Sequence, residues 1–215
     1  ACYITRGQIT ELGPFHFSVL RILIGVGMVR LILRGERLES GSNGLDWLML
    51  AWAFWLLLSS SYHENPSAAL ITRLGNVYDA CGIYLLVRVF CRSFDDLEGL
   101  FRLVPILLVP VALEMIYEKI MVTNLFSILA DGFATPAIRE GKIRARGPFA
   151  HAINGGTLGA VCLPLIVPLW RNHRKVALIG VAACLVIIFT SGSSGPIMSA
   201  VAGIADLLMW NYRHL

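Results

Sequence analysis

The sequence predicts an all-α fold, a polytopic transmembrane helical bundle, and three observations support this class. Of its 215 residues, 56% are hydrophobic and 15% are charged, whereas soluble domains have roughly 45–50% apolar and about 25% charged residues. The apolar residues form runs close to the roughly 20 residues with which a helix crosses a hydrocarbon layer. None of these runs shows the alternation of a membrane β-barrel, so the backbone polar groups must be satisfied inside helices.

We expect about seven spans in a single transmembrane domain that covers residues 1–215. The first residue is not Met, and the last residues follow an apolar run. These features lead us to expect a piece of a longer protein, incomplete at both ends. The five cysteines form no CxxC pair, which favours small buried side chains, and we expect no metal and no cofactor. The spans are predicted near residues 15–33, 45–60, 68–90, 100–117, 152–169, 176–190 and 196–210.

Lysine and arginine residues in the short loops predict the orientation, because cytoplasmic loops collect these residues. One set of loops carries eight of them, and the opposite set carries one, Arg6. The first set is therefore expected on the cytoplasmic side. The net charge of +4 reflects this bias, and we expect no nucleic-acid partner. The eight residues are Arg34, Arg37, Arg92, Arg102, Arg171, Arg174, Lys175 and Arg213.

One further loop, residues 118–151, is basic although this topology places it on the outer face. It breaks the rule that the other loops obey, and a ligand explains such a cationic cluster better than topology does. The alternative is that a longer loop crosses the membrane regardless of its charge. Its cations are Lys119, Arg139, Lys142, Arg144 and Arg146.

The chemistry of this loop predicts a phosphate ligand. Arg144 and Arg146 alternate, and a guanidinium group matches two phosphate oxygens at once. Gly147-Pro148 makes a bend before the next predicted helix, whose N-terminus favours an anion. We expect a phosphate that lives at the membrane surface, such as a polyprenyl-diphosphate head group. The alternative is an anchor to the phosphates of membrane lipids.

Two neighbouring features are predicted to serve the same site. Three glycines leave the helix after the bend thin, so that a bulky ligand or another helix can come close. The segment 190–196, TSGSSGP, also belongs on the outer face, where Ser193 and Ser194 can add neutral donors to the anion. The alternative for this segment is a helix cap with proline in the first turn. The glycines are Gly155, Gly156 and Gly159.

Four ionisable residues lie inside the predicted spans, where charged groups are costly and point to a partner or a cavity. We expect Arg21, Arg73, Asp79 and Glu114 to meet one another beneath the basic loop. Asp79 paired with Arg21 or Arg73 would be a structural ion pair that holds helices together. The alternative is a polar floor under a substrate site.

The motif Arg144-x-x-Gly147-x-Phe149-x-His151, followed by a glycine-rich apolar span, resembles the R-x-x-G-x-F signature of the O-antigen ligase and O-antigen polymerase superfamily. The segment FTSGSSGPIMSA one span later and the lead-in EKIMVTNLFS, residues 118–127, are also similar to bacterial members of this group. The resemblance covers about residues 70–210.

This resemblance implies a metal-independent glycosyltransferase that crosses the bacterial inner membrane several times, with the basic loop in the periplasm. The implied donor is a glycan on undecaprenyl diphosphate, and the implied acceptor is a sugar hydroxyl on a lipid core or another repeat unit. Arg144 and Arg146 would stabilise the leaving diphosphate. The further residues implied in the site are His151 as a catalytic candidate and Arg139, Lys142, Gly147, Asn154, Ser193 and Ser194 as substrate-binding residues.

Two parts of the implied mechanism stay open. The general base can be Glu118, Glu140 or His151, and the alternative role of His151 is to cap the fifth span. The family carries further catalytic Arg and His residues on a large outer loop in a C-terminal half that lies beyond this sequence. We therefore expect the chain alone to be inactive.

Two other function classes fit the same cations. A transporter or flippase for an anionic solute or lipid-linked sugar would bind with them without a reaction. Transporters often show inverted repeats, and no such repeat is visible in this sequence. A non-catalytic membrane subunit would dock an acidic partner on the loop and tolerate lysine in place of arginine, unlike a bidentate phosphate clamp.

Overall fold

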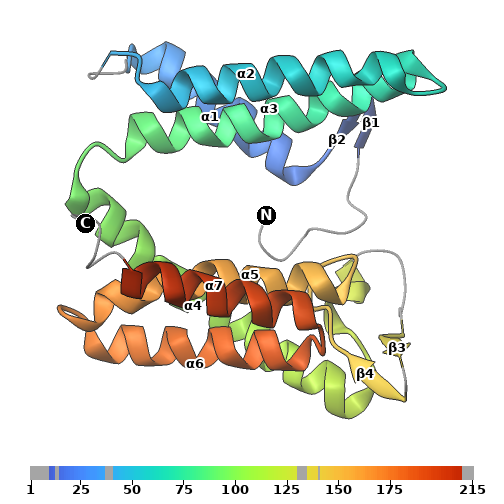
Figure 1. The fold of residues 1–215 in the computed structure, drawn as a ribbon, viewed down its shortest axis with the longest axis vertical. Helices are drawn as coiled ribbons and strands as arrows, with labels where there is room; N and C mark the ends of the chain where they lie inside the picture. The colour runs from blue at the N-terminus through green and yellow to red at the C-terminus, as the bar shows by residue number, and fades with distance from the viewer. Residues whose placement is uncertain (1–9, 13–14, 37–40, 130–134, 140, 210–215) are drawn as a thin grey trace. The chain divides into compact units, whose positions relative to one another are not determined.

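The structure, a computed structural model, describes residues 10–12, 15–36, 41–129, 135–139 and 141–209. In these residues it contains seven α-helices, three short 3-10 helices and two two-stranded antiparallel sheets (Figure 1). The predicted all-α class is confirmed, because each of the seven predicted segments is helical over most of its length. The chain divides into two compact units, whose described residues fall within 10–96 and 97–209, and which we describe separately.

The first unit is a β-hairpin followed by three helices. The hydroxyl of Ser18 accepts a hydrogen bond from the Arg21 N–H (3.4 Å) and so begins the first helix. Asn43 and Asp46 form a capping box that begins the second helix, since each side chain accepts from the backbone of the other. The elements are β1 (Thr10–Leu12), β2 (Phe15–Phe17), α1 (Val19–Arg34), α2 (Gly44–Leu58), the 3-10 helix Ser59–Tyr62 and α3 (Pro66–Phe90).

The prediction that the first span starts at residue 15 is wrong. Phe15–Phe17 is strand β2, which pairs with β1 in antiparallel register. Ser18 keeps an extended backbone (φ −83°, ψ 158°) while its side chain caps α1, so the helix begins only at Val19. At the other end α1 stops at Gly35, whose φ of 62° suits a glycine C-cap.

An ion pair joins α1 to α3. Arg21 donates to Asp79 through Nε, 3.1 Å from Oδ1, and through Nη2, 3.2 Å from Oδ2. Gly75 makes room for this pair, because a Cβ at that position would collide with the Arg21 guanidinium group. Arg73 lies instead beside His63, with 3.3 Å between its Nη2 and the imidazole Nε2. Of the two pairings predicted for Asp79, the one with Arg21 is formed.

A second polar contact joins α2 to α3. Asp46 accepts a hydrogen bond from the Tyr84 hydroxyl (2.8 Å) and forms an ion pair with Arg88. Tyr84 and Arg88 are four residues apart on one face of α3, which lets both reach the same carboxylate. The three helices of this unit are thus connected by one ion pair on each side of α3.

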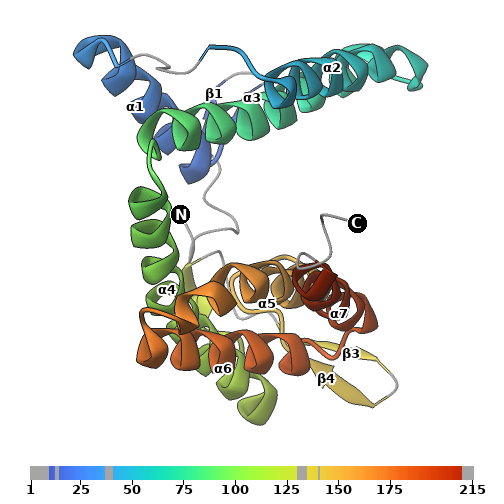
Figure 2. The same ribbon diagram turned by 60° about the vertical axis from the view of Figure 1, so that its left-hand side comes forward.

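The second unit contains most of α4 and three further helices, with a second β-hairpin (Figure 2). The helix α5 packs against both α6 and α7. The elements are α4 (Phe94–Met121), the 3-10 helix Leu125–Leu129, β3 (Ala137–Arg139), β4 (Lys142–Arg144), α5 (Ala152–Ile166), the 3-10 helix Val167–Trp170, α6 (Arg174–Thr190) and α7 (Ser194–Met209).

Two glycines of α5, Gly156 and Gly159, serve helix packing. A Cβ on Gly159 would lie 2.8 Å from the Cys184 carbonyl oxygen of α6, and a Cβ on Gly156 would lie 2.6 Å from Pro196 Cγ of α7. Both distances are shorter than a Cβ tolerates, so only glycine lets the two neighbours come this close. Of the two uses predicted for this thin helix, the approach of other helices is the one formed.

Among the described residues, three helices are long and apolar enough to cross a membrane. Among the others, α1, α6 and α7 have 16, 17 and 16 residues, fewer than the roughly 20 that a perpendicular span needs. The helix α3 has 25 residues but carries Arg73, Asp79 and Arg88. Three of the seven predicted spans therefore satisfy length and composition together. They are Gly44–Tyr62, Phe94–Met121 and Ala152–Trp170, two of which include a terminal 3-10 turn.

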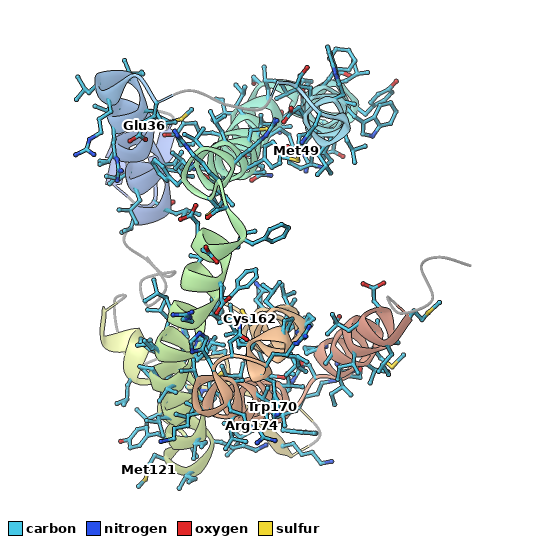
Figure 3. All side chains as sticks on the ribbon, turned by 90° about the vertical axis from the view of Figure 1, so that its left-hand side faces the viewer. Glu36, Met49, Met121, Cys162, Trp170 and Arg174 are labelled. Carbon is cyan, nitrogen blue, oxygen red and sulfur yellow. The ribbon has the colours of Figure 1, made fainter. Side chains whose placement is uncertain are left out.

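The outside of the second unit is rich in large apolar side chains (Figure 3). Leu113, Ile120 and Phe189 are 62%, 68% and 62% exposed, which in a membrane protein is the surface that faces lipid. At the junction of α5 and α6, the Arg174 guanidinium lies 5.9 Å from the centre of the Trp170 ring (Figure 3). Aromatic and basic side chains of this kind are typical of the end of a span.

Gly156→Ala is expected to destabilise the protein by about 1–3 kcal/mol, because the added methyl group must displace Pro196 and the Ser191 hydroxyl. Reversible unfolding in mixed micelles measures the change. The matched control is Gly203→Ala on α7, where the nearest atom, Pro164 Cγ, is 3.4 Å away. The control should be neutral or slightly stabilising, since alanine is the better helix former. Equal losses in both variants would contradict the packing role of Gly156.

Candidate anion-binding site

The basic loop contains a β-hairpin that places three cations on one face. Gly141 lies in the turn with a φ of 72°, which glycine adopts without steric cost. Arg139 pairs with Lys142, and Ala137 pairs with Arg144. Because side chains alternate along a strand, Arg139, Lys142 and Arg144 share one face. Like charges directly opposite one another destabilise a sheet, so this hairpin favours an anion on its basic face.

The corner between α6 and α7 docks onto strand β4. The Ala145 N–H donates to the Thr190 carbonyl oxygen at 3.1 Å. Arg144 forms a hydrogen bond from Nη2 to the Ser193 hydroxyl and another from Nε to the Ser191 carbonyl oxygen (3.4 Å). The segment TSGSSGP therefore lies against the basic loop, as the sequence predicts. Two different nitrogens hold the Arg144 guanidinium in one orientation.

A cavity of about 380 Å³ lies between the hairpin and this corner. Small-molecule sites commonly enclose roughly 300–1,000 Å³. One side supplies the three cations, and the other supplies hydroxyl groups and the first turn of α7, where the helix dipole is positive. Its described lining includes no carboxylate and no imidazole. The lining residues are Arg139, Lys142, Arg144, Ile153, Gly192, Ser193, Ser194 and Gly195.

Two buried carboxylates at the end of α4 anchor the loop. Glu118 has no exposed surface, and its Oε2 accepts hydrogen bonds from the N–H groups of Arg146 and Gly147, each at 2.9 Å. Glu114, one turn earlier, is 6% exposed, and its Oε1 accepts from the Leu125 N–H at 3.0 Å. Acidic side chains of α4 thus replace the water that these backbone groups would otherwise bind.

Asn124 completes the anchor from inside the loop. It is fully buried; its Nδ2 donates to the Gly147 carbonyl oxygen at 2.8 Å, and its Oδ1 accepts from the Ser127 N–H at 2.9 Å. Gly147 itself has a φ of 58°, a conformation that a side chain would strain. Both polar backbone groups of Gly147 are therefore held, one by Glu118 and one by Asn124.

The structure brings together five of the predicted site residues and separates the others from the cavity. Arg146 is turned toward Glu118, with 3.9 Å between its Nε and the carboxylate Oε1, and its Nη2 donates to the Thr135 carbonyl oxygen at 3.2 Å. Gly147 is buried and does not line the cavity. The five that line the cavity are Arg139, Lys142, Arg144, Ser193 and Ser194.

His151 and Asn154 lie at the start of α5 and do not line the cavity. His151 occupies the N-cap position with an extended backbone, but its side chain forms no capping hydrogen bond. Both side chains are exposed. The prediction that His151 caps the fifth span is therefore right in that His151 is the N-cap residue of α5. It is wrong in that the side chain forms no hydrogen bond to the helix.

The four predicted intramembrane residues have separate surroundings. Arg21, Arg73 and Asp79 belong to the first unit, where Arg21 and Asp79 pair. Glu114 belongs to the second unit and holds the loop. The predicted meeting of all four beneath the basic loop stays a prediction.

Two of the three anchoring residues, Glu118 and Asn124, were not predicted to anchor the loop. The sequence predicts Glu118 only as a candidate base and predicts no functional role for Asn124. The sequence does show a carboxylate and an amide at the end of an apolar run, directly before a basic loop. Buried polar groups of this kind need hydrogen-bond partners, which could have indicated a contact with the loop. Neither residue type reveals its partner from spacing alone, since 28 and 23 residues separate the bonded pairs.

A second polar cluster lies at the opposite end of α4. Glu98 accepts from Arg102 at 2.7 Å and contacts the His173 Nε2 at 2.9 Å. Glu98 and Glu118 are 20 residues apart on one helix, which at the α-helical rise corresponds to about 30 Å. This equals the typical thickness of a bilayer hydrocarbon core, about 30 Å.

Comparison of the chain with protein-family models, curated proteins and solved structures finds no match. Among the described residues, no group of three His, Cys, Asp or Glu side chains is placed to hold a metal ion. The case for a function therefore rests on the cavity and its surroundings.

Asn124→Asp is expected to destabilise the protein by about 2–3 kcal/mol, because it replaces a buried amide donor by a carboxylate beside the Gly147 carbonyl oxygen. Unfolding in mixed micelles measures the change. The matched control is Asn154→Asp, an exposed position in the first turn of α5, where a negative charge should be neutral or slightly favourable. A loss at Asn154 as large as that at Asn124 would contradict the anchoring role.

Proposed function

We propose that this chain forms part of a bacterial membrane glycosyltransferase of the O-antigen ligase or polymerase type. In this proposal the protein transfers a glycan from undecaprenyl diphosphate to an acceptor sugar hydroxyl at the periplasmic face of the inner membrane. The observation that carries the proposal is the set of three cations that share one face of the hairpin and line a cavity of about 380 Å³.

The arrangement of the cations favours a diphosphate over a general anchor to lipid phosphates. Arg144 is held by Ser193 and Ser191, so its guanidinium group is oriented before a ligand arrives. A preorganised donor binds a specific anion more strongly than a mobile surface cation does. Arg139 and Lys142 add charge on the same face. Ser194 and the first turn of α7 supply neutral donors and a favourable dipole.

The proposed setting is a bundle whose seven helices all cross the membrane, with the cavity at the outer surface. Support comes from the three helices that satisfy length and composition and from polar clusters about 30 Å apart along α4. The excess of Lys and Arg in the opposite loops favours the outer position of the cavity.

The proposed reaction is a substitution at the anomeric carbon of the glycan. The acceptor hydroxyl oxygen forms a bond to that carbon as the bond to the diphosphate oxygen breaks. The electron pair leaves with the polyprenyl diphosphate, and the hydroxyl proton passes to a general base outside the described lining of the cavity. Arg144, Arg139 and Lys142 stabilise the negative charge that develops on the leaving diphosphate.

The composition of the lining favours one alternative, a transporter or flippase for an anionic solute or lipid-linked sugar. The described lining residues can bind an anion, but none of them is a carboxylate or imidazole that could accept a proton. A transporter needs only the binding step. The two functions differ in whether a covalent bond of the donor is broken.

In the full-length protein, Arg144→Lys is expected to reduce glycan transfer by about 100-fold, because an ammonium group cannot make both hydrogen bonds of the guanidinium group and still face the leaving diphosphate. The measurement is acceptor-dependent release of polyprenyl diphosphate by the purified protein in nanodiscs. The matched control is Arg171→Lys, an exposed arginine after the 3-10 turn that follows α5, which should keep full activity.

The same preparation separates the two functions. Release of polyprenyl diphosphate that requires an acceptor supports the transferase. Movement of the lipid-linked glycan across proteoliposome membranes without any release supports the transporter and overturns the transferase. Full transfer activity in Arg144→Lys would overturn the role of the cavity as the diphosphate site.

The orientation is tested by single cysteines introduced into a chain that lacks its native cysteines. Lys142→Cys is expected to react with a membrane-impermeant maleimide on intact cells, because its loop is proposed to face outward. Lys175→Cys, which is also exposed and lies at the start of α6, should react only after the cells are permeabilised. The reverse pattern would contradict the proposed orientation.

A further inference from the structure

A buried contact with Glu118 holds one side of the arginine-containing segment, residues 144–147. Glu118 is completely buried at the end of α4, and its Oε2 takes both the Arg146 and the Gly147 N–H groups at 2.9 Å. One residue earlier, the Ala145 N–H is bonded to Thr190, and Arg144 is bonded to Ser193. The segment from Arg144 to Gly147 is thus held between α4 and the corner of α6 and α7.

The side chain of Arg146 has a different role from that of Arg144. Its exposed fraction is 14%, and its Nε lies 3.9 Å from Oε1 of Glu118, which has no exposed surface. Neither of these two atoms has a hydrogen-bond partner among the described residues. The guanidinium group is the opposite charge that a buried carboxylate needs, and Arg146 does not line the cavity.

We propose that Glu118 is the positioning residue of the cationic cavity and that Arg146 is its charge partner, without contact to the bound anion. This inference rests on the proposed anion site and deepens it, because it separates two arginines that stand two residues apart and have the same chemistry. Glu118 acts through the backbone of Arg146 and Gly147, which sets the place of Arg144 at the cavity.

The charge partnership makes an unusual prediction. Arg146→Gln leaves the buried Glu118 carboxylate unpaired, so the segment should loosen and the cavity should bind an anion roughly tenfold more weakly or worse. Adding Glu118→Gln removes that unpaired charge and keeps one oxygen to accept both N–H groups. The double variant should therefore bind the anion with an affinity within about threefold of that of the wild type. The effects of the two substitutions on affinity are then not additive, as expected for residues in contact.

The experiment compares four proteins in nanodiscs at one salt concentration: the wild type, Arg146→Gln, Glu118→Gln/Arg146→Gln and Arg144→Gln. Titration calorimetry with inorganic pyrophosphate measures the affinity of the cavity. Hydrogen exchange of the backbone amides at positions 146 and 147 measures whether the segment is held. We expect Arg146→Gln to exchange faster and bind weakly, the double variant to recover both properties, and Arg144→Gln to bind weakly with normal exchange.

A double variant with normal amide protection that fails to bind pyrophosphate would show that Arg146 contacts the anion, and would overturn the inference. Unchanged exchange in Arg146→Gln would overturn the charge partnership. If the wild type binds no pyrophosphate, the proposed anion site fails. Recovered amide protection in the double variant then still supports the pairing of Glu118 with Arg146, and continued fast exchange overturns it.

Discussion

The hydrogen bonds from the Arg146 and Gly147 N–H groups to the buried carboxylate of Glu118 are the contact on which the second unit depends. A basic segment beside apolar helices has no intrinsic position, because its charges repel one another and its backbone groups need partners. Glu118 supplies two acceptor contacts and a compensating charge at once. Asn124 holds the other side of Gly147, so that both polar backbone groups at the bend have a partner.

This anchor explains how like charges can be gathered at one cavity. Arg139 and Lys142 face each other across the hairpin, which costs free energy in an isolated sheet. The docking of Arg144 onto Ser193 and Ser191 keeps the third cation beside them. An anion in the cavity, such as the proposed diphosphate, would lower the repulsion among these cations.

The charged side chains of the helices also have defined partners or positions. Arg21 and Asp79 neutralise each other between α1 and α3, and Asp46 pairs with Arg88 between α2 and α3. Glu98 and Glu118 lie at opposite ends of α4, with mostly apolar turns between them that are partly buried and partly exposed. These described charged side chains are either paired between helices or placed at the ends of α4, which is the arrangement that a bilayer favours.

The sequence by itself determined the helices, because long apolar runs can satisfy their backbone in lipid only as helices, and it also determined which cations are close in the chain. It overextended the first helix at Phe15–Phe17, where the Ser18 cap decides the start. The tertiary structure alone decided that Arg144 lines the cavity while Arg146 turns to Glu118. The physical reason is that both partners come from distant helices, α4 and the corner of α6 and α7, and local spacing carries no information about which of two equivalent arginines meets which.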